Sequence, residues 1–313
     1  LGVTSEQIMC ETGTLGIPEF GTGFTISMLV DTKPKSFAEL IKISGLSHGT
    51  DVWLGNAQEL IRNGTVAFKD VIGCRDDIMV YLMYHGLEPI KAFKIMEFVR
   101  KGKATKDPET WKGHVETMQK AGIEEWFIES CHKIKYMFPK AHAAAYVMSA
   151  FRIAYYKVHK PMVYYASYFS TRFDDFDITA MINGYESIKN KIIEINNKGY
   201  DASNKESSVL ETLKLALEAT ARGVIFGNID LMKSDAKNFI IDDDNKTLIP
   251  PFRSIDGLGD VVAQNICEEA KKKPFISVEE FQKRCKVSQT LVDKMKVMGI
   301  LNNMPETSQL SLF

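Results

Sequence analysis

The chain has 313 residues, of which 45% are hydrophobic and 25% charged, and its formal net charge is −1 at pH 7. This length allows a sizeable core and predicts two domains or one domain with a lobe, while the near-neutral balance means that nucleic-acid binding would have to rest on local charge. The five cysteines lie far apart without zinc-ligand spacing, which argues against structural zinc and favours reduced, cytoplasmic thiols. Charged residues interrupt the apolar run of residues 143–169, so we expect no membrane span. The chain lacks an initiator methionine, and we expect it to be a piece of a longer protein.

The first fifty residues are predicted to contain turns and one helix. Glycines and prolines punctuate residues 1–22, which favours turns packed against a neighbouring element. A helix is expected to begin at Ser36 and to end at Gly45, and the polar turn that follows contains His48. Such a turn can cap a helix or point backbone amides at an anion, and a cap is the commoner use.

A helical hairpin is predicted over residues 70–103, and the apolar face of its second helix includes Ile90 and Phe93. This second helix and its exit also carry the densest group of positive charges in the chain, which is opposed by Glu97 alone. The group consists of Lys91, Lys94, Arg100, Lys101, Lys103 and Lys106. Phosphates would gain charge-assisted hydrogen bonds there, although a solvated helix face explains these charges at least as well.

The chain is organised around a segment that begins Phe-Pro-Lys-Ala-His-Ala-Ala-Ala-Tyr at residue 138. Pro139 suits the first turn of a helix, and His142 and Tyr146 then lie one turn apart on the same face. This polar and aromatic stripe beside Lys140 suits a phosphate or a nucleobase. A buried core helix, with its histidine and tyrosine merely satisfied, is an equally good interpretation.

The middle of the chain is predicted to be mostly helical. Helices are expected over residues 107–121, 123–137, 161–169, 178–197 and 209–221, and the polar segment 198–205 is expected to be the linker between two domains. Short β-prone runs follow at residues 224–226, 239–241 and 247–249. The acidic run 242–244 lacks the ligand spacing of a calcium loop and is expected to be a solvated turn.

Residues 254–266 match the helix-hairpin-helix pattern, in which a tight turn holds a DNA phosphate without reading sequence. The turn consists of Asp256, Gly257, Leu258 and Gly259. Its two glycines expose amides beside a helix N-terminus, and Lys271 lies at the far end of that helix. A second, degenerate hairpin is expected over residues 287–301. A tight turn without any DNA role remains the alternative for the Gly-x-Gly sequence.

The chain ends in Gln309, Leu310, Ser311, Leu312 and Phe313. Apolar side chains at the very end of a soluble chain form an exposed anchor that suits a pocket in a partner. The sequence Gln-Leu-Ser-Leu-Phe resembles the bacterial sliding-clamp-binding peptide, so we expect this tail to bind the sliding clamp.

The segment at residues 138–147 closely resembles the family C DNA polymerases, the alpha subunits of bacterial DNA polymerase III. Three further stretches agree with this family, namely residues 14–22, 43–53 and 73–78. Their versions resemble the PolC type more than the DnaE type. The matching blocks run in family order, so the resemblance covers almost the whole chain.

This resemblance implies a mainly α fold, with a multi-helix fingers domain followed by a small α+β helix-hairpin-helix DNA-binding domain. The expected boundaries are 1–200 for the fingers, 201–304 for the duplex-binding domain and 305–313 for the clamp-binding tail. The implied activity is template-directed DNA synthesis by the full-length enzyme, with Mg²⁺ bound by a palm outside this sequence and no metal bound here. The acidic pair Asp76 and Asp77 is expected to cap a helix or to form ion pairs, and this piece is not expected to be active alone.

The resemblance also implies the partners and the site residues. The partners are primer-template DNA, dNTP, the sliding clamp, and the rest of the polymerase chain and replisome. The expected nucleotide-binding residues are Arg75, Lys94, Arg100, Lys101, His142 and Tyr146. The expected DNA-binding residues are His48, Lys103, Lys140, Asp256, Gly257, Leu258, Gly259 and Lys271. A non-enzymatic DNA-binding adaptor for the clamp and a DnaE-type polymerase are the alternatives.

Overall fold

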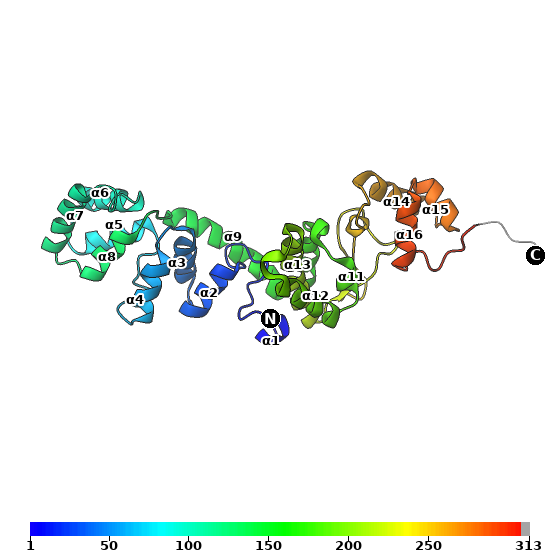
Figure 1. Cartoon of the computed structure of the whole chain (residues 1–313), viewed down its shortest axis with the longest axis horizontal. Coiled ribbons are helices and arrows are strands. Elements are labelled where there is room, and N and C mark those ends of the chain that lie inside the picture. Colours follow the sequence, from blue (N-terminus) through cyan, green and yellow to red (C-terminus); the bar gives the residue numbers. More distant parts are fainter. Residues whose placement is uncertain (308–313) are drawn as a thin grey trace, which may run out of the picture. The chain divides into compact units, whose positions relative to one another are not determined.

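The computed structural model describes residues 1–307, so the predicted clamp-binding residues Gln309, Leu310, Ser311, Leu312 and Phe313 lie outside the described residues. The described chain is mainly helical with one small sheet, which confirms the predicted fold class (Figure 1). It forms two compact units. The N-terminal unit is Thr14–Ala154, and the C-terminal unit combines Leu1–Gly13 with the residues from Tyr155 onward. None of the described helices is both long and apolar enough to cross a bilayer.

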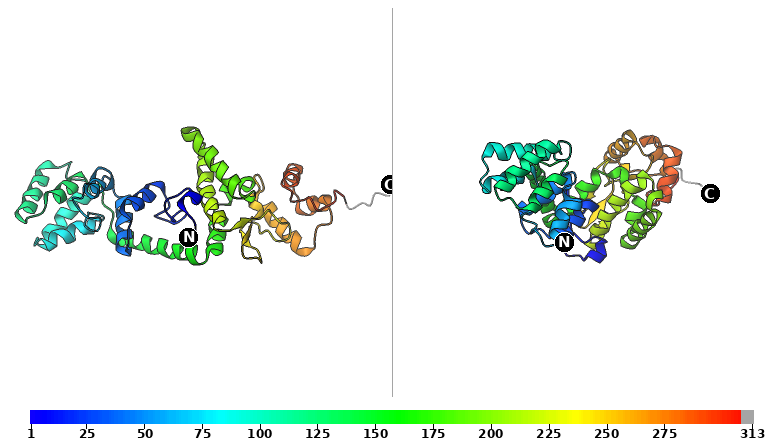
Figure 2. Two further views of the ribbon diagram at one scale, coloured as in Figure 1. Left: turned by 90° about the horizontal axis from the view of Figure 1, so that it is seen from below. Right: turned by 60° about the vertical axis from the view of Figure 1, so that its left-hand side comes forward.

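The N-terminal unit is built from helices. They are α2 (Gly23–Thr32), α3 (Phe37–His48), α4 (Gln58–Arg62), α5 (Arg75–Tyr84), α6 (Pro89–Arg100), α7 (Pro108–Lys120), α8 (Glu125–Lys133) and most of α9 (Lys140–His159), with an irregular turn η1 (Trp53–Ala57) before α4. A proline opens α6 and α7, and Pro139 directly precedes α9, as the sequence predicts. Figures 1 and 2 show α9 as one continuous helix.

Helix α3 does not end at Gly45, contrary to the prediction, but continues to His48. Gly45 lies against the loop before α5. A Cβ atom at this position would be 2.4 Å from the carbonyl oxygen of Gly73 and 2.4 Å from Sγ of Cys74. This glycine therefore permits a close approach of two segments, and the continued helix places His48 in its last turn.

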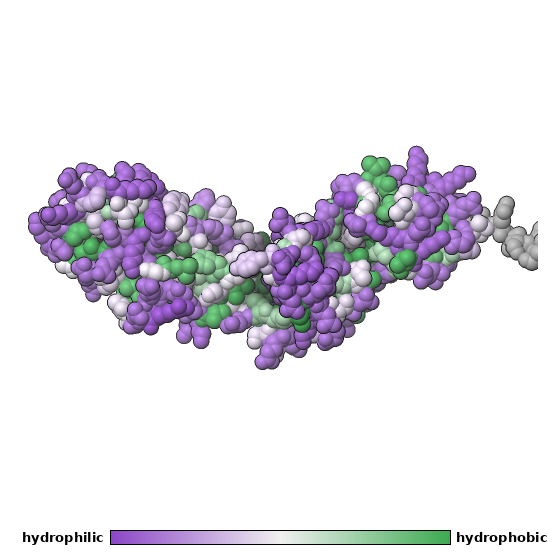
Figure 3. All heavy atoms as spheres, in the orientation of Figure 1, coloured by the Kyte–Doolittle hydropathy of each residue, from purple (hydrophilic) through white to green (hydrophobic). Residues whose placement is uncertain are grey.

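Helices α5 and α6 pack against each other as the predicted hairpin. Ala92, Ile95 and Val99 form the buried stripe of α6, at the spacing of one helical face. Ile90 and Phe93, which were predicted on this face, are instead 70% and 48% exposed, because the 3.6-residue turn of the helix places both of them away from this stripe. The surface drawn in Figure 3 is mostly hydrophilic over α6 and α7, with small hydrophobic areas between.

The C-terminal unit combines helices with the sheet. Its helices are α1 (Ser5–Ile8), the end of α9, α10 (Pro161–Ser170), α11 (Ile178–Ile182), α12 (Tyr185–Lys198), α13 (Asn204–Ala221), α14 (Asp260–Lys272), α15 (Val278–Cys285) and α16 (Gln289–Val297), with short turns η2 (Phe173–Asp175), η3 (Gly199–Asp201) and η4 (Phe252–Ser254). The single helix predicted over 178–197 is divided in two, because Gly184 adopts a φ of 83° between α11 and α12. Helices α12 and α13 pack together, so the predicted linker 198–205 connects a helical pair.

The three predicted strands form one sheet in the order β1-β3-β2. The strands are β1 (Ile225–Phe226), β2 (Ile240–Ile241) and β3 (Thr247–Ile249), with β1 parallel and β2 antiparallel to β3. Four aromatic rings pack beside the sheet with centroid distances of 4.8 to 5.9 Å, and they belong to Phe169, Phe176, Phe226 and Phe239. This cluster anchors the sheet to α10 and the turn before α11.

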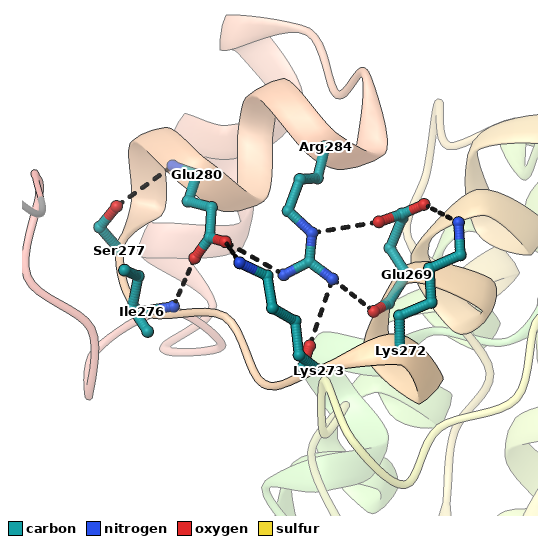
Figure 4. Close-up of polar contacts among 7 residues, drawn as sticks. All are labelled: Glu269, Lys272, Lys273, Ile276, Ser277, Glu280 and Arg284. Atoms are coloured by element: carbon teal, nitrogen blue, oxygen red, sulfur yellow. Dashed lines mark hydrogen bonds and ion pairs between the residues drawn. The ribbon is translucent and has the colours of Figure 1, made fainter.

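Arg284 of α15 ties that helix to the end of α14 (Figure 4). Its guanidinium donates to the carboxylate of Glu269 at 3.1 Å, to the Glu269 carbonyl at 2.6 Å and to the Lys273 carbonyl at 3.2 Å. It also pairs with Glu280 at 3.3 Å. Carbonyls in the last turn of a helix lack helical partners, so Arg284 acts as the C-terminal cap of α14.

Candidate nucleic-acid interface

The segment 134–139, between α8 and α9, joins helix ends that are far apart in the sequence. It forms backbone hydrogen bonds with Thr50 after α3 (2.9 Å), with Arg75 at the start of α5 (3.1 Å) and with Arg100 at the end of α6 (3.3 Å). The predicted site residues near these helix ends therefore gather around one segment of the N-terminal unit.

A row of four rings runs from α3 into α9. The ring of His48 stacks on Phe138 at 4.8 Å, Phe138 meets His142 edge-on at 5.2 Å, and His142 meets Tyr146 at 4.8 Å. His142 is exposed and Tyr146 is 47% exposed, so the interpretation of this stripe as a buried core is wrong. Nε2 of His48 lies 2.7 Å from the carboxylate of Glu19, which fixes the first ring. Exposed aromatic rings of this kind offer a stacking surface for a base.

Two cations and two carboxylates lie beside this row. Lys140 pairs with Asp77 at 3.1 Å, and Nε of Arg75 lies 3.9 Å from Asp76. Asp76 also accepts the backbone amide of Lys140 at 2.8 Å, and Asp77 accepts the amide of Cys74 at 3.1 Å. The prediction that Asp76 and Asp77 cap a helix or form ion pairs is therefore confirmed. The nearby Asp77 carboxylate raises the pKa of Lys140, which stays charged and half-exposed.

The predicted cationic patch at the end of α6 is partly neutralised. Arg100 donates to both carboxylate oxygens of Glu97, and Lys101 pairs with the same carboxylate at 2.9 Å. Hydrogen bonds from these two cations lower the pKa of Glu97 to about 2. Lys103 is exposed just beyond the helix, whereas Lys94 lies six residues before Arg100, about 9 Å along the helix, and does not join the gathered residues.

Replacing Glu97 by glutamine is expected to destabilise the protein in a pH-dependent way. Because the pKa of Glu97 is lower in the folded than in the unfolded state, its stabilising effect is complete above pH 4.5 and is lost as the pH falls toward 2. Solvent screening limits the difference to about 1 kcal/mol at pH 7. Urea unfolding of both proteins at pH 7 and at acidic pH measures it. A difference that is equal at both pH values would contradict this assignment.

The predicted DNA-binding hairpin precedes α14 in the C-terminal unit. Gly257 adopts a φ of 87°, Leu258 is fully buried and Gly259 is the N-cap of α14. The amides of Gly257 and Gly259 have no hydrogen-bond partner within residues 1–307. The buried leucine thus anchors a turn whose exposed glycines leave two amides for a ligand such as phosphate. The helix before the turn is only the short η4. The second hairpin predicted over residues 287–301 is placed too late, because this range contains only one helix, α16, and the helix joined to it by a short turn is α15, which ends at Cys285.

The other two predicted residues near this hairpin differ in their surroundings. The Asp256 side chain is 99% exposed and pairs with Lys294 of α16 at 3.0 Å, which links the two hairpins. Lys271 is exposed near the end of α14, about 18 Å along the helix from Gly259, so the two residues would meet different phosphates. Within the described part of the chain, no three His, Cys, Asp or Glu side chains are grouped so that they could hold a metal ion.

Comparison with known proteins finds one family match in each of these two regions. Residues 4–122 match the family described as the bacterial DNA polymerase III alpha subunit finger domain, and residues 223–310 match the helix-hairpin-helix motif. The whole chain is 58% identical to DNA polymerase III PolC-type from Halalkalibacterium halodurans, 58% to that from Bacillus subtilis and 54% to that from Staphylococcus epidermidis. The chain is homologous to one segment of PolC-type DNA polymerase III. It spans 21% of the length of these curated relatives.

Two residues that hold the candidate site together were not predicted from the sequence. Glu19, at a φ of 69°, accepts the hydroxyl of Ser44 at 2.9 Å and pairs with His48. Lys42 donates to two backbone carbonyls at 2.6 and 2.7 Å before α5, and burial lowers its pKa. Glu19 lies in the stretch 14–22 that carries the PolC resemblance, which was the available signal, whereas nothing in the sequence distinguished Lys42.

Proposed function

We propose that this chain serves in a replicative DNA-directed DNA polymerase of the PolC type. The observation that carries the proposal is the identity of 54–58% with such polymerases over all 313 residues. The reaction is addition of deoxynucleotides to a primer 3′ end, with Mg²⁺ held by a palm that these residues do not include. The protein works in the cytoplasm with the rest of the polymerase chain and the replisome.

Residues 1–200 act as the fingers in this proposal. The exposed rings of His142 and Tyr146 line the nascent base pair, where aromatic stacking tolerates every base. Arg75, Arg100 and Lys101 neutralise the triphosphate, and Lys94 serves as a more distant cation. His48, Lys103 and Lys140 contact the DNA backbone. The carboxylates paired with these cations set their positions in the absence of substrate.

Residues 201–304 hold the duplex in this proposal. The two free amides of the hairpin meet one phosphate and Lys271 meets another, and neither contact depends on base sequence. Residues 305–313 form the tail, whose Gln309 donates a hydrogen bond while Leu310, Leu312 and Phe313 fill a groove of the sliding clamp. Loss of clamp binding on truncation at Ser308 tests the tail.

Replacing His142 by alanine in the full-length polymerase is expected to raise the KM for dNTP. One stacking contact is worth about 1–3 kcal/mol, so the expected rise is about 5- to 160-fold. Steady-state primer extension measures it. His85→Ala is the matched control, because this exposed histidine also packs on an aromatic ring, that of Tyr81 at 4.3 Å, outside the ring row. Equal KM values for the two variants would remove His142 from the nucleotide site.

Replacing Gly257 by alanine is expected to weaken duplex DNA binding about tenfold, because an L-residue resists the φ of 87° that exposes the hairpin amides. Fluorescence anisotropy with a labelled 20-base-pair duplex measures the affinity. Gly64→Ala is the matched control, since Gly64 has a φ of 70° and open space around its Cα. The hairpin assignment fails if both variants bind DNA like the wild type.

A further inference from the structure

A cleft of about 610 Å³ opens in the C-terminal unit, apart from the hairpin. Four segments meet there: the end of α9, the start of α10, the end of α13 and the turn between β2 and β3. The basic residues that line it are His159, Lys160, Arg222 and Lys246, and the lining contains no acidic side chain. The cleft therefore concentrates positive charge in a concave surface.

The lysines of the cleft differ from their neighbours in lacking carboxylate partners. Lys233 pairs with Asp242 at 2.9 Å, and Lys237 pairs with Asp260 at 2.6 Å. Lys160 and Lys246 are exposed and form no ion pair with any residue of the described range 1–307. The Asp244 carboxylate in the same turn acts electrostatically on Lys246 but forms no ion pair with it. An anion would thus meet ammonium groups that hold no carboxylate at contact distance.

Arg222 is held in place by the fold. One of its nitrogens donates to the carbonyl of Lys157 at 2.8 Å and to the hydroxyl of Tyr165 at 2.9 Å. That hydroxyl in turn donates to Glu218 at 2.7 Å. A guanidinium has five N–H donors in a rigid fork, so these contacts position Arg222 and leave donors for a ligand.

The start of α10 adds to the same lining. Pro161 is its first residue, and Lys160 makes no side-chain cap. The amides of Met162 and Val163, which belong to the first turn, consequently have no partner from the helix. They supplement the cationic side chains of Lys160, Arg222 and Lys246 with partial positive charge.

We propose that this cleft is a phosphate-binding site, separate from the hairpin, that holds a backbone phosphate of the bound DNA. The proposal rests on the proposed DNA-binding function. Free pyrophosphate presents the same anionic phosphate groups and is the second source from which the cleft could take its ligand. A side chain such as Lys160 or Lys246 that contacts one phosphate contributes about 0.9 to the slope of log affinity against log salt.

The test compares the full chain with the variant K160A/K246A in two titrations. The first measures binding of a labelled 20-base-pair duplex by anisotropy at several NaCl concentrations, and the second measures binding of pyrophosphate by calorimetry. The matched control is K189A/K214A, which removes the same charge from α12 and α13 outside the cleft lining. Circular dichroism confirms that each variant is folded.

We expect K160A/K246A to bind the duplex about tenfold more weakly at 100 mM NaCl and with a salt slope smaller by about 1 to 2, and the control to change less than twofold. Unchanged DNA binding with loss of pyrophosphate binding would support the site with free pyrophosphate as its ligand. Unchanged binding of both overturns the proposal. If the wild-type chain binds no DNA, the proposed function fails, and the pyrophosphate titration still decides whether the cleft binds phosphate.

Discussion

Replacing Gly45 by alanine is expected to destabilise the N-terminal unit by about 2–4 kcal/mol. The new methyl group would lie 2.4 Å from both the Gly73 carbonyl oxygen and Sγ of Cys74. All three residues are buried, and the opposing atoms belong to the backbone or to a packed side chain. Helix α3 would have to move away from the loop before α5, and His48 in its last turn would move with it.

The measurement is urea unfolding followed by tryptophan fluorescence. Trp53, Trp111 and Trp126 are the three tryptophans of the chain, and all belong to the N-terminal unit, so this signal reports on that unit. Gly113→Ala is the matched control, because Gly113 also lies inside a helix but has open space around it. Alanine is the better helix former, so the control is expected to gain up to about 1 kcal/mol. Wild-type stability of Gly45→Ala would show that α3 and this loop do not approach so closely.

Gly45 also marks the limit of what the sequence could predict about the fold. Helix starts were predictable, because a proline in the first turn is a local signal that worked for α6, α7, α9 and α10. A glycine can end a helix, break it or allow close packing, and local sequence does not distinguish these uses. Gly45 permits packing inside α3, whereas Gly184 divides two helices, and both were predicted wrongly for this reason.

The candidate site shows a similar limit. The sequence indicated which residue types belong to the site, but not which of them contact one another. The sequence indicated His48, His142 and the basic residues, since their chemistry suits bases and phosphates. It could not indicate that Phe138 joins the two histidine rings, because His48 and Phe138 come from segments ninety residues apart. Nor could it indicate that Glu97 holds both Arg100 and Lys101. Ion pairs depend on rotamers and neighbours, which the fold determines.

Removing one charge of the buried pair Lys157–Glu218 is expected to destabilise the C-terminal unit by about 3–5 kcal/mol. The ammonium of Lys157 lies 2.9 Å from the Glu218 carboxylate, and the two side chains are 1% and 0% exposed. Lys157 also donates to the Gly13 carbonyl at 2.9 Å, and Glu218 accepts the hydroxyl of Tyr165 at 2.7 Å. Burial lowers the pKa of Lys157 and raises that of Tyr165, so the carboxylate is what keeps the ammonium charged in the core.

The variants Glu218→Gln and Lys157→Met each leave the opposite charge buried without its counter-ion. The double variant removes both charges, so it leaves no buried charge of this pair. The double variant is therefore expected to lose much less stability than the sum of the two single losses. Glu211→Gln is the matched control, because Glu211 forms an exposed pair with Lys214 on the same helix and is expected to cost less than about 0.5 kcal/mol. Urea unfolding followed by far-UV circular dichroism gives the four values. Additive losses would mean that the two charges do not compensate each other, and that the link from α9 to α13 depends on packing and on the remaining hydrogen bonds instead.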